Sequence, residues 1–128
     1  MRTAAQIAGF AVATVVLWWL ALPSDWSAVP TTDPHTYGSP VRGGQWAVAA
    51  AGTAVLAAAA GFTRGVLVAL AGVAVPAFAL FCYRSATAEV IGANLWIVGA
   101  LLAAPVLVVG VARAAALGRL VRRATLSR

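Results

Sequence analysis

The residues able to do chemistry gather in one short polar segment. Residues 31–40, TTDPHTYGSP, hold the single histidine, His35, and one of the three acidic residues, Asp33. A second acid, Asp25, precedes them closely. Carboxylate and imidazole groups bind zinc, and a zinc site needs three or four ligands. These residue types therefore raise the hypothesis of a metal site formed by Asp25, Asp33 and His35.

Nucleophilic catalysis is the other chemistry that this segment suggests. Hydroxyl groups lie near the histidine: Ser24, Ser27, Thr31 and Thr32. Catalysis needs a nucleophile, a base and an orienting group within hydrogen-bond reach. The spacing Gly-x-Ser-x-Gly and its strand–turn–helix context, which support such an assignment, do not accompany these residues. We expect neither enzymatic activity nor a cofactor, and we favour a solvated loop over a metal site.

The rest of the chain is strongly apolar. Of its 128 residues, 62% are hydrophobic and only 9% are charged, whereas about 25% of the residues of a soluble domain are charged. The net charge of +6 comes from arginine alone. A basic balance can indicate nucleic-acid binding, but cytoplasmic arginines that orient a membrane protein explain it here. The composition predicts an integral membrane protein with no nucleic-acid partner, and the alanine and arginine usage suggests a bacterial source.

Four apolar segments define the predicted fold: residues 4–22, 45–62, 66–83 and 95–112. Each has 18 or 19 residues and contains no charged residue or histidine. A helix of this length spans about 27–28 Å, close to the thickness of a hydrocarbon core. The first segment exceeds the ~7–15 apolar residues of a signal peptide, so we expect it to be retained. The prediction is an all-α, four-helix transmembrane domain over residues 1–112.

Charge predicts the orientation of this bundle. Four helices put both ends of the chain and the turn at 63–65 on one side of the membrane. That side carries most of the arginines: Arg2, Arg64, Arg113, Arg119, Arg122, Arg123 and Arg128. All three acids fall on the other side with Arg42 and Arg84. The positive-inside rule then predicts that both ends lie in the cytoplasm, the N-in/C-in topology.

The aromatic residues agree with this polarity. Tryptophan and tyrosine favour the membrane–water interface. The predicted outer anchors are Trp18, Trp19, Trp26, Trp46, Tyr83 and Trp96. Residues 23–44 become the single long loop on the outer side, where water is sufficient reason for polar side chains.

Small residues and arginines indicate contact surfaces. In lipid, helices attract one another by close packing of small residues. The glycines expected at helix contacts are Gly9, Gly52, Gly61, Gly72 and Gly99. Residues 113–128 form a basic cytoplasmic tail, with a short amphipathic helix as one option. The arginines expected to contact lipid headgroups or a partner there are Arg113, Arg119, Arg122 and Arg123.

The functional hypotheses follow from the lack of ionisable side chains in the predicted membrane spans. Ion-coupled transport usually needs an ionisable residue within a helix, and the predicted spans contain none. The leading hypothesis is a non-catalytic protein of the bacterial cytoplasmic membrane, either an accessory subunit of a larger complex or a homo-oligomer. One alternative is a small transporter or channel for an apolar or amphipathic solute. The other is a binding module for a metal, lipid or protein, built on the outer loop.

Overall fold

The computed structural model describes residues 2–90 and 92–128, and in this part of the chain four helices are long and apolar enough to cross a membrane. The predicted all-α fold is therefore confirmed. The first two membrane helices are α1 (Arg2–Ala21) and α2 (Gly43–Thr63). α2 begins two residues before the expected start, and the Arg42 backbone N–H donates to Gln45 Oε1 at 2.8 Å, which closes its first turn.

The third membrane helix is built from three parts. They are α3 (Val66–Ala69), the single π-helical turn η1 (Leu70–Ala74) and α4 (Val75–Thr87). The π turn ends two residues before Pro76, which has no N–H to donate and whose ring crowds the carbonyl four residues earlier. The proline thus reshapes the helix without ending it.

The fourth membrane helix is α5 (Trp96–Leu126), which runs past the expected end at residue 112 and includes most of the tail. Residues 112–117, ARAAAL, are good helix formers, so nothing in the local sequence ends the helix there. The tail is therefore a direct extension of the last membrane helix and not a separate element.

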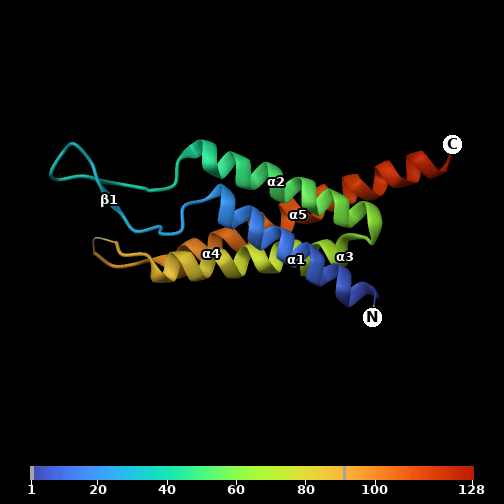
Figure 1. Ribbon diagram of the computed structural model, residues 1–128, viewed down its shortest axis with the longest axis horizontal. Coiled ribbons are helices and arrows are strands. Elements are labelled where there is room, and N and C mark those ends of the chain that lie inside the picture. Colours follow the sequence, from blue (N-terminus) through green and yellow to red (C-terminus); the bar gives the residue numbers. More distant parts are fainter. Residues whose placement is uncertain (1, 91) are drawn as a thin grey trace.

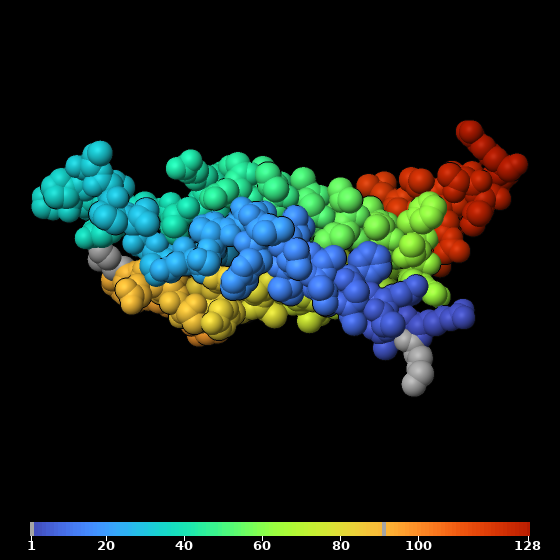
Figure 2. Space-filling view, viewed as in Figure 1, coloured from blue at the N-terminus to red at the C-terminus, as the bar shows by residue number. Residues whose placement is uncertain are grey.

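The helices run antiparallel in sequence order (Figure 1). Both ends of the described chain and the turn after α2 lie at one end of the bundle, called here the terminal end. The long loop at residues 22–42 and the described parts of the next link, residues 88–90 and 92–95, lie at the opposite end, called the loop end. Figure 2 shows α1 across one face and the last turns of α5 projecting beyond the other helices at the terminal end.

The core consists mostly of small side chains. One buried cluster lies toward the terminal end: Ala57, Ala60, Ala69, Val73, Ala74, Val111 and Ala115. A second lies toward the loop end: Trp18, Leu22, Val41, Ala49 and Ala77. Because alanine keeps helix backbones close together, the bundle gains van der Waals contact where lipid offers no hydrophobic drive between helices.

The long loop contains a short hairpin. Strands β1 (Val29–Pro30) and β2 (Tyr37–Gly38) pair antiparallel, with Val29 opposite Gly38. The hairpin extends away from the helices (Figure 1). The loop therefore has its own local structure and stands apart from the membrane-spanning part.

Candidate functional site

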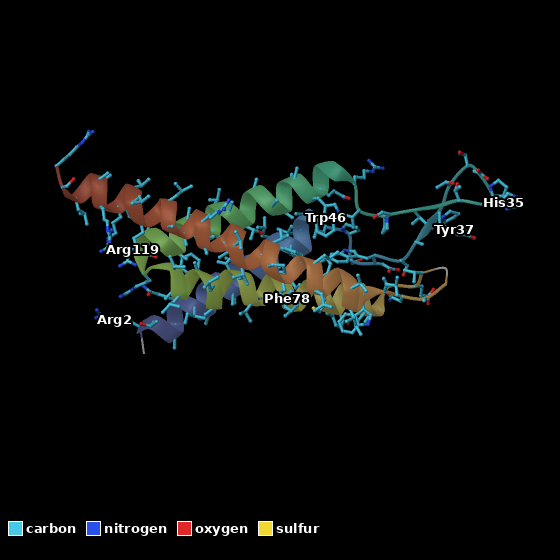
Figure 3. The ribbon with its side chains drawn as sticks, turned by 180° about the vertical axis from the view of Figure 1, so that it is seen from behind. Arg2, His35, Tyr37, Trp46, Phe78 and Arg119 are labelled. Atoms are coloured by element: carbon cyan, nitrogen blue, oxygen red, sulfur yellow. The ribbon has the colours of Figure 1, made fainter. Side chains whose placement is uncertain are left out.

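The structure does not bring together the side chains of the three residues of the hypothetical metal site in its described part. Asp33 accepts a hydrogen bond from the His35 backbone N–H at 3.0 Å, which is a turn contact that leaves the imidazole free. His35 lies at the exposed tip of the loop (Figure 3). In residues 2–90 and 92–128, no group of three or more His, Cys, Asp or Glu side chains is placed to hold a metal ion.

Asp25 belongs to a different contact, which ties the loop to the following link. Its carboxylate accepts hydrogen bonds from the Ser27 hydroxyl at 2.6 Å and the Ser27 backbone N–H at 2.9 Å. These bonds hold the pKa of Asp25 below its usual value. The Ser27 oxygen in turn accepts the Glu89 backbone N–H at 2.8 Å, and Ala28 N–H donates to the Glu89 carbonyl at 2.9 Å. The polar groups here clamp two connections together.

The aromatic residues at the loop end form a packed cluster. Trp26 from the loop stands edge-on to Trp46 of α2 and to Phe81 of α4, with ring centroids 5.4 and 5.7 Å apart. Trp18 of α1 meets Trp46 in the same way at 6.2 Å. Edge-to-face pairs of this kind are favourable. The cluster fixes the start of the loop onto three helices.

The other expected interface anchors differ in their surroundings. Trp19 and Tyr83 are exposed, and the Arg84 guanidinium lies 4.4 Å from the centre of the Trp19 ring. Trp96 is half-buried at the start of α5. Trp18 instead lies inside the bundle, where its indole N–H donates to the Thr53 hydroxyl at 3.0 Å.

An apolar cleft of about 320 Å³ opens between α2 and α5. Its floor is made by Trp18, Thr53 and Phe81, and its walls are mostly small or aliphatic. The other lining residues are Trp46, Ala49, Ala50, Ala54, Ala103, Val106, Leu107, Gly110 and Val111. Several of them are exposed on the apolar flank of the bundle, so the cleft opens sideways toward the membrane interior.

The cleft results from a close helix crossing. A Cβ at Gly61 would collide with the Ala115 carbonyl, and one at Gly118 would collide with the Ala58 carbonyl. α2 and α5 therefore touch backbone to backbone near the terminal end. Toward the loop end α5 lies beside α4 instead (Figure 1), and the space left between α2 and α5 becomes the cleft.

The remaining glycines of the expected packing set divide into two groups. A Cβ at Gly52 would meet the Leu17 side chain at 2.7 Å, one at Gly72 would meet Phe10 at 3.0 Å, and one at Gly99 would meet Phe81 at 3.6 Å. Among the described residues, a Cβ at Gly9 would meet nothing within 4 Å. Gly9 therefore faces outward from the bundle.

The expected basic surface lies at the terminal end, but the arginines that form it differ from the predicted set. Arg119, Arg122 and Arg123 of α5 line one cavity together with Arg64 from the turn after α2. Figure 3 shows Arg119 and Arg2 at this end of the molecule. Arg113 does not line the cavity.

Comparison of the chain with protein-family models, with curated proteins and with solved structures gave no match.

Two features of these surfaces were missed by reasoning from the sequence. Gly118 lies in the basic tail, outside the predicted spans, although its spacing of three from Ala115 could have marked it as a contact position. Gly110, on the open wall of the cleft, follows a run of aliphatic residues and gives no distinctive signal.

Proposed function

We propose that the protein is a non-catalytic, multi-pass protein of the bacterial cytoplasmic membrane that acts by binding another transmembrane segment. It is either an accessory subunit of a larger membrane complex or a homo-oligomer. The observation that carries this proposal is the apolar cleft between α2 and α5. Its position on the side of the bundle makes it reachable within the membrane plane.

The walls of the cleft suit a helix as partner. Ala50 and Ala54 on α2 and Gly110 on α5 leave both backbones accessible to an approaching helix. Small residues at such a surface favour association in lipid, because close packing and not apolar burial drives it. A helix with large apolar side chains would fill the space that lipid tails otherwise occupy.

The same cleft favours a second candidate function, the transport of an apolar or amphipathic solute. Such a solute would enter from the lipid and would need no charged residue along its path. The outer-loop binding module receives less support, because the polar groups of Asp25 and Asp33 are engaged in turns.

Partner binding is tested by a substitution that fills the cleft. Gly110 lines the cleft and a Cβ there would meet no described atom within 4 Å, so we expect Gly110→Phe to direct its ring into the cleft. Gly9→Phe is the matched control, because it makes the same change on the outward side of α1. Tagged wild type and both variants are extracted in mild detergent, and their complexes are measured by native mass spectrometry.

We expect a stoichiometric membrane partner, or a second copy, that is lost with Gly110→Phe and kept with Gly9→Phe. A monomer in all three samples would overturn the proposal. In that case, uptake of a lipophilic dye by liposomes that hold the protein, blocked by Gly110→Phe only, would establish the transport function instead.

A further inference from the structure

A second cavity, of about 260 Å³, lies at the terminal end and has a different character. It is lined by Arg64, Arg119, Arg122 and Arg123, together with Gly61, Gly65 and Leu126. We refer to it as the arginine pocket. Its position at the end of α2 places it at the headgroup level of a bilayer, just beyond the apolar part of the helix.

The fold builds this pocket from two separate parts of the chain. Gly65 has a φ of 110°, which favours glycine, and so permits the tight turn that presents Arg64. The close crossing at Gly61 and Gly118 brings the last turns of α5 against this turn.

Arg122 fixes the two parts together. Its guanidinium donates to the carbonyls of Phe62 and Thr63, at 3.3 and 3.1 Å. These carbonyls belong to the last turn of α2, where the helix dipole is negative. Arg122 thus acts as a cap for α2, and the other three arginines remain around the opening.

No acidic side chain lies near enough to neutralise the charge of the pocket. The only acids, Asp25, Asp33 and Glu89, all lie in the connections of the loop end, a membrane thickness away. Arginine cannot lose its proton in a protein, so the four charges cannot be relieved by titration. All four arginines are exposed, so water and salt screen part of their mutual repulsion, and a bound anion would reduce it further.

We propose that the arginine pocket binds the phosphate of an anionic phospholipid from the adjacent leaflet. Guanidinium groups match phosphate oxygens with paired hydrogen bonds. Leu126 lines the same cavity, and Leu120 is exposed on the neighbouring face of α5, so apolar surface lies beside the phosphate site. This combination fits an amphiphile better than a free phosphate ion. The proposal does not depend on the function of the α2–α5 cleft.

The test compares two pairs of charge removals, one in the pocket and one outside it. Arg119→Gln with Arg123→Gln removes two pocket arginines, while Arg113→Gln with Arg128→Gln removes two that do not line the pocket. Arg122 is left intact because it caps α2. Binding of phosphatidylglycerol and of phosphatidylcholine to the detergent-purified protein is titrated by native mass spectrometry, with inorganic phosphate as a competitor.

We expect phosphatidylglycerol to bind wild type more tightly than phosphatidylcholine. The pocket pair should lower its affinity about 30-fold, since each arginine near an anionic surface contributes about a factor of five. The control pair should keep the wild-type affinity. If the pocket pair fails to fold, Arg64→Gln tests the same site from the turn and should weaken binding by itself.

Three results would overturn the proposal. The first is equal affinity for the two lipids, and the second is an equal loss with both charge pairs. The third is displacement of the lipid by inorganic phosphate at equal concentration, which would make a soluble anion the ligand.

Discussion

At the scale of single residues, the two buried threonines of the membrane helices hydrogen-bond to backbone and indole groups. Thr53 is buried, and its hydroxyl donates to the Ala49 carbonyl at 2.6 Å while accepting from Trp18 at 3.0 Å. Thr14 is also buried, and its hydroxyl donates to the Phe10 carbonyl at 2.8 Å, while the Gly72 carbonyl of the third membrane helix lies 3.5 Å away. Because a hydroxyl has one proton to donate, the shorter contact within α1 is the main hydrogen bond of Thr14.

Thr53 provides a prediction at this scale. Thr53→Val keeps the shape of the side chain but leaves the Trp18 indole N–H without its acceptor in an apolar interior. We expect a loss of about 1–3 kcal/mol in the free energy of unfolding. Thr53→Ser keeps the hydroxyl and should lose clearly less. Unfolding in detergent micelles measures both, and equal losses would show that the hydrogen bond contributes nothing.

At the scale of elements, the crossing of α2 and α5 decides both candidate surfaces. The contact at Gly61 and Gly118 holds the helices together near the terminal end. On one side of this contact α2 and α5 leave the apolar cleft, and on the other side their ends form the arginine pocket. The unbroken course of α5 from Trp96 to Leu126 is required for both.

Gly118→Leu tests this role of the crossing. Its Cβ would overlap the Ala58 carbonyl, so α5 must move away from α2. We expect a destabilisation of about 1–3 kcal/mol or more, as for other overpacked contacts. A Cβ at Gly110 on the same helix would meet no described atom within 4 Å, so we expect Gly110→Leu to be tolerated. The two are compared by thermal unfolding in micelles, and similar stability of both variants would contradict a tight crossing.

The Gly118→Leu variant also tests whether the arginine pocket depends on the helix crossing. Moving α5 separates Arg119 from Arg64, so its phosphatidylglycerol affinity should fall although no charge is removed. Unchanged affinity would mean that the turn and the helix bind lipid independently.

At the scale of the whole molecule, charge is distributed unequally between the two ends. The terminal end has arginines and no acid, while the loop end holds every acid, the hairpin and the aromatic cluster. From this asymmetry the positive-inside rule predicts that the terminal end lies in the cytoplasm. The proposed phosphate site then faces the inner leaflet.

Single-cysteine labelling tests the orientation. Cys82 is the only cysteine, so Cys82→Ser provides a background without thiols. In that background we expect His35→Cys to react with a membrane-impermeant maleimide in intact cells. Arg128→Cys should react only after permeabilisation. Labelling in the opposite order would reverse the topology and place the arginine pocket in the outer leaflet.

The sequence by itself determined the four membrane helices, the single long loop and the unequal charge of the two ends. These properties follow from hydropathy and charge summed along short stretches, since each stretch partitions between lipid and water largely on its own. The continuation of α5 beyond residue 112 was not anticipated, because the apolar run ends where the helix does not.

Only the tertiary structure decided which faces meet. Small residues occur on nearly every side of these alanine-rich helices, so spacing alone could not distinguish Gly118, which touches α2, from Gly9, which touches nothing described. It also could not bring Arg64 beside Arg119 or bury Trp18 against Thr53. These contacts depend on the rotation and crossing angle of helices far apart in sequence, and packing between backbones fixes both.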